Sequence, residues 1–459
     1  MNTQTSPLTG AVPHVIKGEV VEGADEDYGR FRTPRLDLDA LVWPRCDAPP
    51  AADVPVAEII DILVQLGDWI GRDPEGALER AMLASAGTNP LERGVLERSY
   101  GSLPRCFERA SLEFQVEQEL GGADVLDGWR EVRTPYGTTA RIRAFPPRLI
   151  HIVAGNAPGV TAMTVARGAL TKGVHLLKLP SNDLYTASAV LRGLSAVAPG
   201  HPLSRSFSAA YWRGGDRHVE SMLFRPIFFD KLVAWGGESA LRSAKEYIGP
   251  GFELVAFDPK TSISMIGREV HASDALRAEV ADKAAADATV MDQQACCSSR
   301  FQFVEGSMEE VEAYAAALQA RLGVERAMCS ACTTPPSGEI REEIEALEML
   351  EPDYKVFGTF DGRGIVIRSE VPVDFYPDGK VVNVVRVDRL EDAILEANVA
   401  TQTVGVFPES RRRALRNVLA AQGVQRVTAI GSAGNVQAGL PHDGFLPLQR
   451  FIRWVNDED

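Results

Sequence analysis

Two adjacent cysteines are the residues of this sequence best suited to covalent chemistry. Cys296 and Cys297 stand in the segment MDQQACCSSRF, among small and polar neighbours. Adjacent cysteines rarely form a disulfide with each other, because their Cβ vectors point apart. An accessible thiolate with small neighbours can act as a nucleophile, whereas the usual fate of a free cysteine is to be a small buried hydrophobe. The segment alone leaves both interpretations open.

Three other places carry residues that could serve a nucleophile or a bound cofactor. Asn156, in VAGNAPG, has an amide that can donate to an oxyanion, although Asn beside Gly and Pro is also an ordinary turn residue. Lys178 ends the apolar run VHLLK, where a lysine can also reach solvent without a role. Gly236 and Gly237 precede an expected helix, as a plain turn would also require.

These residues follow the strands of a predicted α/β ladder. From RLIHIVAGN to ESALRSAKEYIG, short apolar runs alternate with amphipathic helices, which predicts βαβ units and a parallel sheet covered on both faces. Ligands of such sheets bind beyond the carboxyl ends of the strands, so Asn156, Lys178 and the two glycines should share one edge. A second α/β stretch starts near Ser262 and contains the two cysteines.

Length, charge and cysteine content narrow the class of protein. A chain of 459 residues favours two or three domains, and a net charge of −15 argues against a nucleic-acid partner. We see no apolar run of membrane length, no secretory signal and too few cysteines for a disulfide framework, so we expect a cytoplasmic protein. The CxxC of Cys329 and Cys332 lacks a second ligand pair, so no metal site is predicted.

Read together, five segments resemble one known family. VAGNAPG, LLKLPSND, VAWGGESA, MDQQACCSS and HDGFLPLQRFIRWV are similar, in order and spacing, to the long-chain acyl-CoA (acyl-protein thioester) reductases of the aldehyde dehydrogenase superfamily. The similarity runs from about Arg141 to Trp454. It implies an α/β, aldehyde dehydrogenase-like fold, with a Rossmann-type cofactor domain, an α/β catalytic domain and a small oligomerisation element that makes the protein a homo-oligomer.

The resemblance also implies a division of the chain into four parts. The first fifty residues show little periodicity, and we expect a loosely held arm there. The expected parts are an N-terminal arm (1–53), a nicotinamide cofactor domain (54–262, with 130–145 adding oligomerisation strands), a catalytic domain (263–430) and a closing and oligomerisation segment (431–459).

The resemblance selects one of the two cysteines as the nucleophile. In that superfamily the nucleophile ends a Gly-Gln-x-Cys pattern, and Gln293-Gln294-Ala295-Cys296 corresponds to it, with Gln293 in the place of glycine. Cys297 would then be a packed neighbour. Asn156 resembles the superfamily's oxyanion asparagine, which would stabilise the tetrahedral oxyanion together with the backbone N–H of Cys296.

The cofactor residues follow from the same resemblance. Lys178 would hydrogen-bond the adenosine ribose of a nicotinamide cofactor, and Gly236 and Gly237 would let a helix approach it. NAD-selective relatives often carry a carboxylate three residues after this lysine, whereas this chain has Ser181, which would not repel a 2′-phosphate. The resemblance therefore implies NADPH, with NADH as the alternative.

One expected residue is absent, and its absence suggests the reaction. Hydrolytic aldehyde dehydrogenases carry a general-base glutamate; if Lys260 matches the lysine of that motif, Ala256 takes its place, whereas a rival register uses Glu253. Without a base, the acyl-enzyme would meet hydride and not water. We expect NADPH-dependent reduction of an acyl thioester, carried by CoA or a carrier protein, to the aldehyde. The alternatives are an aldehyde dehydrogenase working oxidatively and a cysteine hydrolase or acyl-transfer protein.

Overall fold

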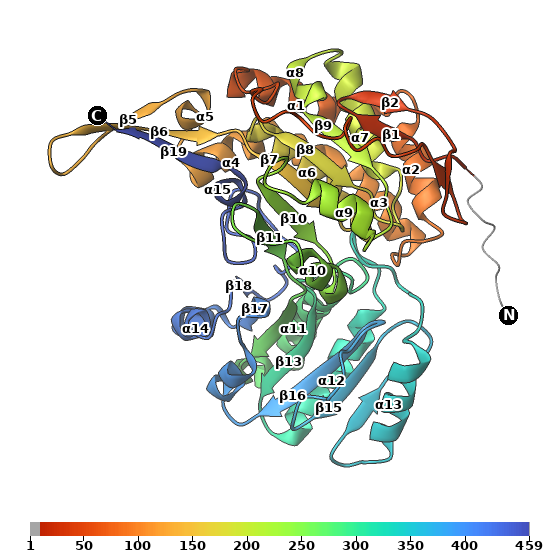
Figure 1. The fold of residues 1–459 in the computed structure, drawn as a ribbon. Helices are drawn as coiled ribbons and strands as arrows, with labels where there is room; N and C mark the ends of the chain where they lie inside the picture. Colours follow the sequence, from red (N-terminus) through yellow and green to blue (C-terminus); the bar gives the residue numbers. More distant parts are fainter. Residues whose placement is uncertain (1–9, 459) are drawn as a thin grey trace. The chain divides into compact units, whose positions relative to one another are not determined.

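The chain contains two compact units, each built around its own seven-stranded sheet (Figure 1). The structure is a computed structural model that describes residues 10–458. Within these residues, unit 1 consists of 10–89, 99–258 and 437–458, and unit 2 of 90–98 and 259–436. Both units are mixed α/β with mainly parallel strands, as predicted.

The sheet of unit 1 has the strand order β11-β10-β7-β8-β9-β1-β2. From β11 to β9 the strands are parallel, and β1 and β2 join the edge antiparallel. The inner strands read as continuous apolar runs because helices bury both faces of a parallel sheet. The strands are β1 (His14–Ile16), β2 (Glu19–Val21), β7 (Arg148–Ile152), β8 (Val174–Lys178), β9 (Phe207–Ala210), β10 (Lys231–Trp235) and β11 (Glu253–Phe257).

Helices and loop segments cover both faces of this sheet. One face carries α6, and α7 and α1 pack beside it, while Trp212, Leu223 and Phe224 pack with Ile150 and Leu176 on the other face. The helices of unit 1 are α1 (Val56–Arg72), α2 (Ala77–Ser85), η1 (Leu103–Phe107), α4 (Arg109–Leu120), α5 (Asp124–Asp127), α6 (Pro158–Leu170), α7 (Thr186–Val197), α8 (Pro202–Arg205), α9 (Arg217–Leu223), α10 (Glu238–Lys245) and α15 (Pro447–Phe451); α3 (Arg93–Gly101) starts in unit 2 and ends in unit 1.

The expectation of a loosely held arm over residues 1–53 is wrong for its described part. Val15 pairs with Ala209, which adds β1 to the sheet, and Trp43 is buried in the core of the unit. The guanidinium of Arg148 is buried and donates to the carbonyls of Trp43 and Pro44. These contacts join segments far apart in sequence, so no local periodicity could show them. Residues 1–9 lie outside the described part.

A small antiparallel sheet belongs to unit 1 and contains the residues expected to form oligomerisation strands. Its order is β19-β6-β5, with β5 (Arg130–Arg133), β6 (Thr139–Phe145) and β19 (Arg453–Glu458). Tyr136, in the β5–β6 turn, is 93% exposed, and Trp454 is also exposed. A two-stranded ribbon pairs β3 (Glu26–Asp27) with β4 (Arg32–Thr33).

The sheet of unit 2 has the strand order β14-β15-β16-β13-β12-β17-β18, parallel except for β14. Helices α11 and α12 pack on one face, and α14 and η3 on the other. The strands are β12 (Thr261–Ile266), β13 (Ser299–Glu305), β14 (Lys355–Phe357), β15 (Ile365–Ser369), β16 (Val381–Val387), β17 (Thr401–Phe407) and β18 (Arg426–Ala429). The helices are η2 (Arg268–Ala272), α11 (Asp274–Ala288), α12 (Met308–Leu322), α13 (Gly338–Glu348), η3 (Leu390–Glu396) and α14 (Glu409–Ala421).

The boundary between the units differs slightly from the expected one. The cofactor domain was expected to end at residue 262, whereas unit 2 begins at Pro259. The reason is the pairing of Thr261 with Thr401, which ties the start of β12 to the second sheet. Among residues 10–458, none of the helices combines the length and the apolar character that crossing a bilayer would require.

Candidate active site

The structure brings the predicted residues of unit 1 to one edge of its sheet. Ile152 pairs with both Lys178 and Ala234, so β7, β8 and β10 end almost in line. Asn156 and Gly236 come shortly after two of these strand ends, and Lys178 is the last residue of the third. The edge predicted from the βαβ pattern is therefore present, and Figure 1 shows the three strands side by side.

The turn that carries Asn156 is fixed by close packing of the residue before it. A Cβ on Gly155 would lie 1.9 Å from Oδ1 of Asn182, so a larger residue there would require the Asn182 side chain to move. Nδ2 of Asn89 donates to the Gly155 carbonyl at 3.1 Å. Asn156 itself is half-buried and stands just before α6, whose first residue is Pro158. Gly155 thus allows close packing of the turn, and the side-chain amide of Asn156 lies at the border of the core.

Lys178 does not extend into solvent. It is 8% exposed, and its Nζ lies 5.5 Å from the ring centroid of Trp212 and 5.9 Å from that of Tyr211. Burial lowers the pKa of Lys178, and Glu220 opposes that change. The ammonium group of this lysine, held beside aromatic rings at the end of a strand, is a hydrogen-bond donor in a fixed place. A ribose hydroxyl could accept its hydrogen bond.

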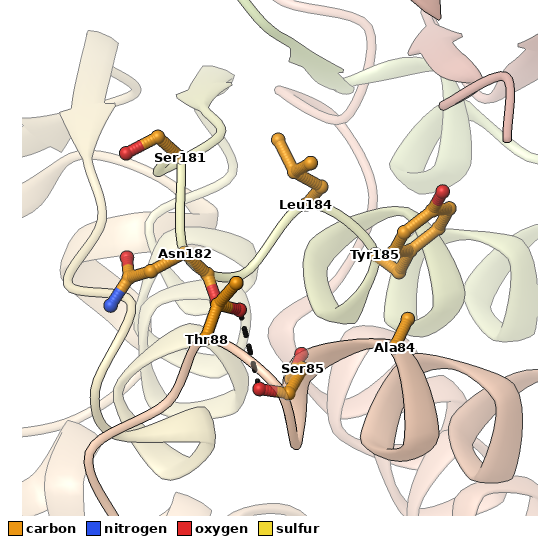
Figure 2. Close-up of a pocket in the computed structure, with 7 residues that line it drawn as sticks. All are labelled: Ala84, Ser85, Thr88, Ser181, Asn182, Leu184 and Tyr185. Atoms are coloured by element: carbon orange, nitrogen blue, oxygen red, sulfur yellow. Dashed lines mark hydrogen bonds between the residues drawn. The ribbon is translucent and has the colours of Figure 1, made fainter. Parts of the chain in front are cut away.

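Ser181 stands at the rim of a small pocket in unit 1 (Figure 2). The hydroxyl of Thr88 donates to the carbonyl of Asn182 at 2.8 Å and fixes the loop that carries Ser181. Nη2 of Arg30 donates to the Ser181 carbonyl at 3.1 Å, so a guanidinium lies beside this residue. The pocket is lined by Ala84, Ser85, Thr88, Ser181, Asn182, Leu184 and Tyr185.

The two glycines after β10 differ in their surroundings. A Cβ on Gly237 would meet no heavy atom within 4 Å among the described residues, whereas one on Gly236 would lie 3.3 Å from the Cβ of Ala240. Helix α10 begins at the next residue, Glu238. The space in front of Gly237 is open, so a ligand could approach the backbone there more closely than at a residue with a side chain.

The two candidate positions for the general base, residues 253 and 256, lie toward opposite ends of β11. Glu253 is the first residue of the strand and pairs with Lys231; it forms ion pairs with Lys231 at 3.0 Å and with Arg450 at 2.6 Å. Ala256 pairs with Ala234, next to the carboxyl end of the sheet. The carboxylate of Glu253 thus lies at the edge away from Lys178, and the position at the functional edge carries a methyl group.

In unit 2 the two neighbouring cysteines have different environments. Cys296 is exposed, whereas Cys297 is 5% exposed, and burial raises the pKa of Cys297 to about 12. A buried thiol with so high a pKa remains protonated and unreactive at neutral pH. Of the two, only Cys296 has the access that a nucleophile needs, in agreement with the register of the Gly-Gln-x-Cys pattern.

Three consecutive non-glycine residues before the cysteines have left-handed backbone conformations. Their φ values are +52° at Met291, +50° at Asp292 and +70° at Gln293. Such residues cost on the order of 1–3 kcal/mol each and persist only where surrounding contacts hold them. The last of the three is the residue expected to correspond to the glycine of the Gly-Gln-x-Cys pattern, and its φ is one that glycine adopts readily.

Buried side chains hold this left-handed turn. Oδ1 of Asp292 accepts the backbone N–H of Ser330 at 2.7 Å. The amide of Gln293 donates to the carbonyl of Val381 at 2.9 Å and accepts the N–H of Lys380 at 2.8 Å. The side chain of Gln293 therefore anchors the turn to the start of β16.

Two residues that belong to no recognisable sequence motif contact Cys296. Nε2 of Gln402 donates to Sγ at 3.0 Å, and Oγ of Ser262 donates to the Cys296 carbonyl at 2.8 Å. Both residues are buried, at 6% and 1% exposure. The one available signal was the polar triplet Thr401-Gln402-Thr403 at the start of an otherwise apolar strand.

The other residues with sulfur or imidazole groups that sequence patterns single out are the CxxC cysteines and His442, in the C-terminal PHDG segment. Sγ of Cys332 donates to the carbonyl of Asp361 at 3.1 Å, and Cys329 is buried. His442 packs edge-on against Trp235 and Phe257, at 5.4 and 5.2 Å between ring centroids. Within residues 10–458, no three His, Cys, Asp or Glu side chains are grouped as metal ligands would be.

Comparison with known proteins gives the family. The family model described as Acyl-CoA reductase (LuxC) matches residues 51–454. The long-chain acyl-protein thioester reductase of Photorhabdus laumondii is 31% identical over 79% of this chain and 73% of its own length. The enzyme of the same name from Vibrio harveyi is 28% identical over 97% of this chain and 93% of its own.

Solved structures agree on the fold. An NAD-dependent benzaldehyde dehydrogenase from Corynebacterium glutamicum has a TM-score of 0.71 at 15% identity, with all of both chains covered. An NADP-dependent glyceraldehyde-3-phosphate dehydrogenase from Bacillus halodurans has a TM-score of 0.66 at 14% identity, over 97% and 95% of the two chains. The chain therefore belongs to the acyl-CoA reductase (LuxC) family and is an oxidoreductase with the aldehyde dehydrogenase fold.

Proposed function

We propose that this protein reduces an acyl thioester, carried by CoA or a carrier protein, to the aldehyde with NADPH. The observation that carries the proposal is the exposed thiol of Cys296, in a turn held by buried side chains and beside a cysteine that is buried. The relatives in Photorhabdus laumondii and Vibrio harveyi, named long-chain acyl-protein thioester reductases, support an acyl thioester as the substrate.

In the proposed reaction, Cys296 forms and then breaks a bond to the acyl group. Its thiolate attacks the thioester carbonyl carbon, a new C–S bond forms, and the carrier thiolate leaves and takes a proton from solvent. When bound, reduced nicotinamide supplies the hydride that the acyl carbon needs. The resulting oxyanion collapses to the aldehyde, and the Cys296 thiolate is released. The proposal assigns to Asn156 the donation of a hydrogen bond to the oxyanion in both steps.

The residues at the sheet edge of unit 1 fit a nicotinamide dinucleotide. Lys178 offers a fixed donor for a ribose hydroxyl, and the open space at Gly237 permits close approach to the backbone. Ser181 carries no charge, and the guanidinium of Arg30 lies beside its carbonyl. A cation at this place, with no carboxylate at residue 181, favours a cofactor with a 2′-phosphate, which is why we propose NADPH and keep NADH as the alternative.

The lack of a carboxylate at residue 256 supports reduction over the oxidative alternative. An oxidative aldehyde dehydrogenase needs a base that activates water against the acyl-enzyme, and Ala256 cannot act as one. Glu253, the rival candidate, is engaged by Lys231 and Arg450 at the other end of the strand. We therefore propose that the acyl group on Cys296 is passed to hydride and not to water. We further propose that the exposed small sheet joins copies into a homo-oligomer.

An absorbance assay tests the proposal against its alternatives. Purified protein with a panel of acyl-CoA esters and NADPH should oxidise NADPH and release one aldehyde for each NADPH consumed. Release of CoA without NADPH oxidation would indicate a hydrolase, and a stable acyl-protein without turnover would indicate an acyl-transfer protein. Either result would overturn the proposed function, and the panel would also define the acyl chain.

A further inference from the structure

We propose that Gln402 is the donor that stabilises the thiolate form of Cys296. Its Nε2 lies 3.0 Å from Sγ, in the direction of donation, and both residues belong to unit 2. The inference rests on the proposed role of Cys296 and names the residue that prepares its sulfur for attack. A hydrogen bond to a charged acceptor is stronger than one to a neutral acceptor, so the contact favours thiolate over thiol.

The orientation of the Gln402 amide is set by a neighbour. Oγ1 of Thr403 donates to Oε1 of Gln402 at 3.4 Å, which turns the N–H side of the amide toward the sulfur. Gln402 is 6% exposed and Thr403 is fully buried, so water has little access to either group. The amide is therefore aimed at Sγ before any substrate arrives, and no reorganisation is needed for it to donate.

The backbone of Cys296 is held from β12, the strand that pairs with the one carrying Gln402. The hydroxyl of Ser262 donates to the Cys296 carbonyl at 2.8 Å and accepts the backbone N–H of Thr403 at 3.2 Å. The register of β12 against β17 shifts at this point, between Thr261 and Ile263. Such irregularities often redirect side chains near active sites. The carbonyl and the sulfur of the nucleophile are thus both contacted by residues that lie at this irregularity.

A neutral donor suits the proposed reaction better than a charged one. A carboxylate at position 402 would repel the thiolate and could also take a proton from water beside the acyl group. The amide of glutamine stabilises negative charge on sulfur but cannot act as a base at neutral pH. Gln402 therefore activates the nucleophile without restoring the hydrolytic function that the alanine at residue 256 removes.

The test is the pH dependence of alkylation at Cys296, followed by peptide mass spectrometry with iodoacetamide as the probe. Gln402→Leu should shift the half-maximal rate to higher pH and slow alkylation about tenfold near pH 7, with the same limiting rate at high pH. Gln402→Glu should be slower still, because it places a like charge beside the sulfur. An unchanged pH profile in both variants would overturn the proposal.

Controls separate this effect from a general disturbance of unit 2. Gln319→Leu removes a comparable amide hydrogen bond, to the Gly364 carbonyl at 3.3 Å, and should keep the wild-type profile at Cys296. The exposed Cys332 should alkylate at one rate in all variants, whereas alkylation of the buried Cys297 would report unfolding. If Gln402→Leu unfolds, the isosteric Gln402→Glu decides, and an unchanged profile there overturns the proposal.

The outcome is independent of the proposed reaction. Alkylation needs neither an acyl donor nor NADPH, so the role of Gln402 can fail while reduction is observed. Conversely, the proposed function fails if the acyl-CoA assay yields no aldehyde, whatever the alkylation profile of Cys296. If the Gln402→Leu variant regains acyl-CoA reduction at higher pH, where more of Cys296 is thiolate, the shift seen by alkylation would explain the loss of reduction.

Discussion

The two units present their functional residues in different ways. In unit 1, the carboxyl ends of neighbouring parallel strands or the turns after them carry the functional residues, which are Asn156, Lys178 and Gly236. In unit 2, Cys296 lies in a turn whose conformation depends on contacts from distant parts of the chain, such as Gln402 and Ser262. A parallel sheet creates a binding edge by its topology alone, whereas a reactive thiol needs side chains placed around it one by one.

The largest effect that sharpens this comparison should come from the two cysteines. Cys296→Ala should lower thioester reduction by roughly three orders of magnitude or more, because the covalent intermediate can no longer form. Cys297→Ala should keep most of the activity and lose roughly 1 kcal/mol of stability, since one buried sulfur is removed. NADPH oxidation with acyl-CoA measures both. The reverse order of effects would show that the register of the pattern is off by one residue.

The next largest effect should be confined to the cofactor side. Lys178→Met keeps an unbranched side chain among Tyr211 and Trp212 but removes the charged donor. We expect KM for NADPH to rise roughly ten- to a hundredfold, the effect of losing one hydrogen bond of a charged group. Acylation of Cys296 in the absence of NADPH should continue at the wild-type rate, because the proposal assigns Lys178 to the cofactor and not to the transfer of the acyl group. A loss of acylation would show that Lys178 does more than hold the cofactor.

Acid should weaken unit 1 through its buried histidines. Burial lowers the pKa of His14 to about 4 and of His175 to about 3, and holds that of His151 well below its usual value. In the unfolded chain these groups take up protons near pH 6.5, so the stability they contribute above that pH is lost as pH falls toward 4. Burial raises the pKa of Glu119 to about 7 and also raises that of Asp183. The contribution of these two carboxyl groups to stability changes with pH in the opposite direction, but the three histidines outnumber them.

Tryptophan fluorescence can follow this loss in one unit alone. All six tryptophans of the chain lie in unit 1. The urea concentration at the midpoint of their signal should decrease as the pH is lowered from about 7.5 to about 5. In unit 2, burial raises the pKa of Asp287 to about 6 and lowers that of His271, so the two opposing groups leave a smaller pH dependence. A tryptophan midpoint that stays constant or rises toward pH 5 would contradict this interpretation.

The smallest effect concerns Glu253, the rival candidate for the general base. Glu253→Gln should change thioester reduction by less than about twofold, because its carboxylate pairs with Lys231 and Arg450 at the far end of β11. Glu253→Asp serves as the control that keeps the charge. Reduction assays with release of free acid measured in parallel check this prediction. A large loss of activity in the glutamine variant alone would restore Glu253 as a base.

Much of the fold could be predicted because parallel sheets leave a strong local signal. Continuous apolar runs such as RLIHI and VHLLK alternate with helices, and the residues after them mark the functional edge. The N-terminal segment was missed because β1 and β2 are only 3 residues long and Val15 finds its partner, Ala209, far along the chain. Strands this short have no readable period, and pairing over such a distance is fixed by tertiary contacts.

The residues of the candidate site also differ in whether a local sequence pattern or a tertiary contact identifies them. Cys296, Asn156 and Lys178 were visible as residue types in motifs, whereas Gln402 was not, because a single glutamine at a strand start has no motif of its own. The places of Glu253 and Ala256 along the sheet also required the strand register, which sequence left open and pairing with β10 defines. Motifs thus identify groups that meet a ligand, and only coordinates identify the groups that hold them.

The most direct test of the account is the identity of the acylated residue. Protein incubated with an acyl-CoA substrate in the absence of NADPH should be trapped as an acyl-enzyme, and peptide mass spectrometry should find the acyl group on Cys296. Addition of NADPH should then remove the label and release aldehyde. An acyl group on Cys297 or on any other residue, or no adduct during active turnover, would contradict the account.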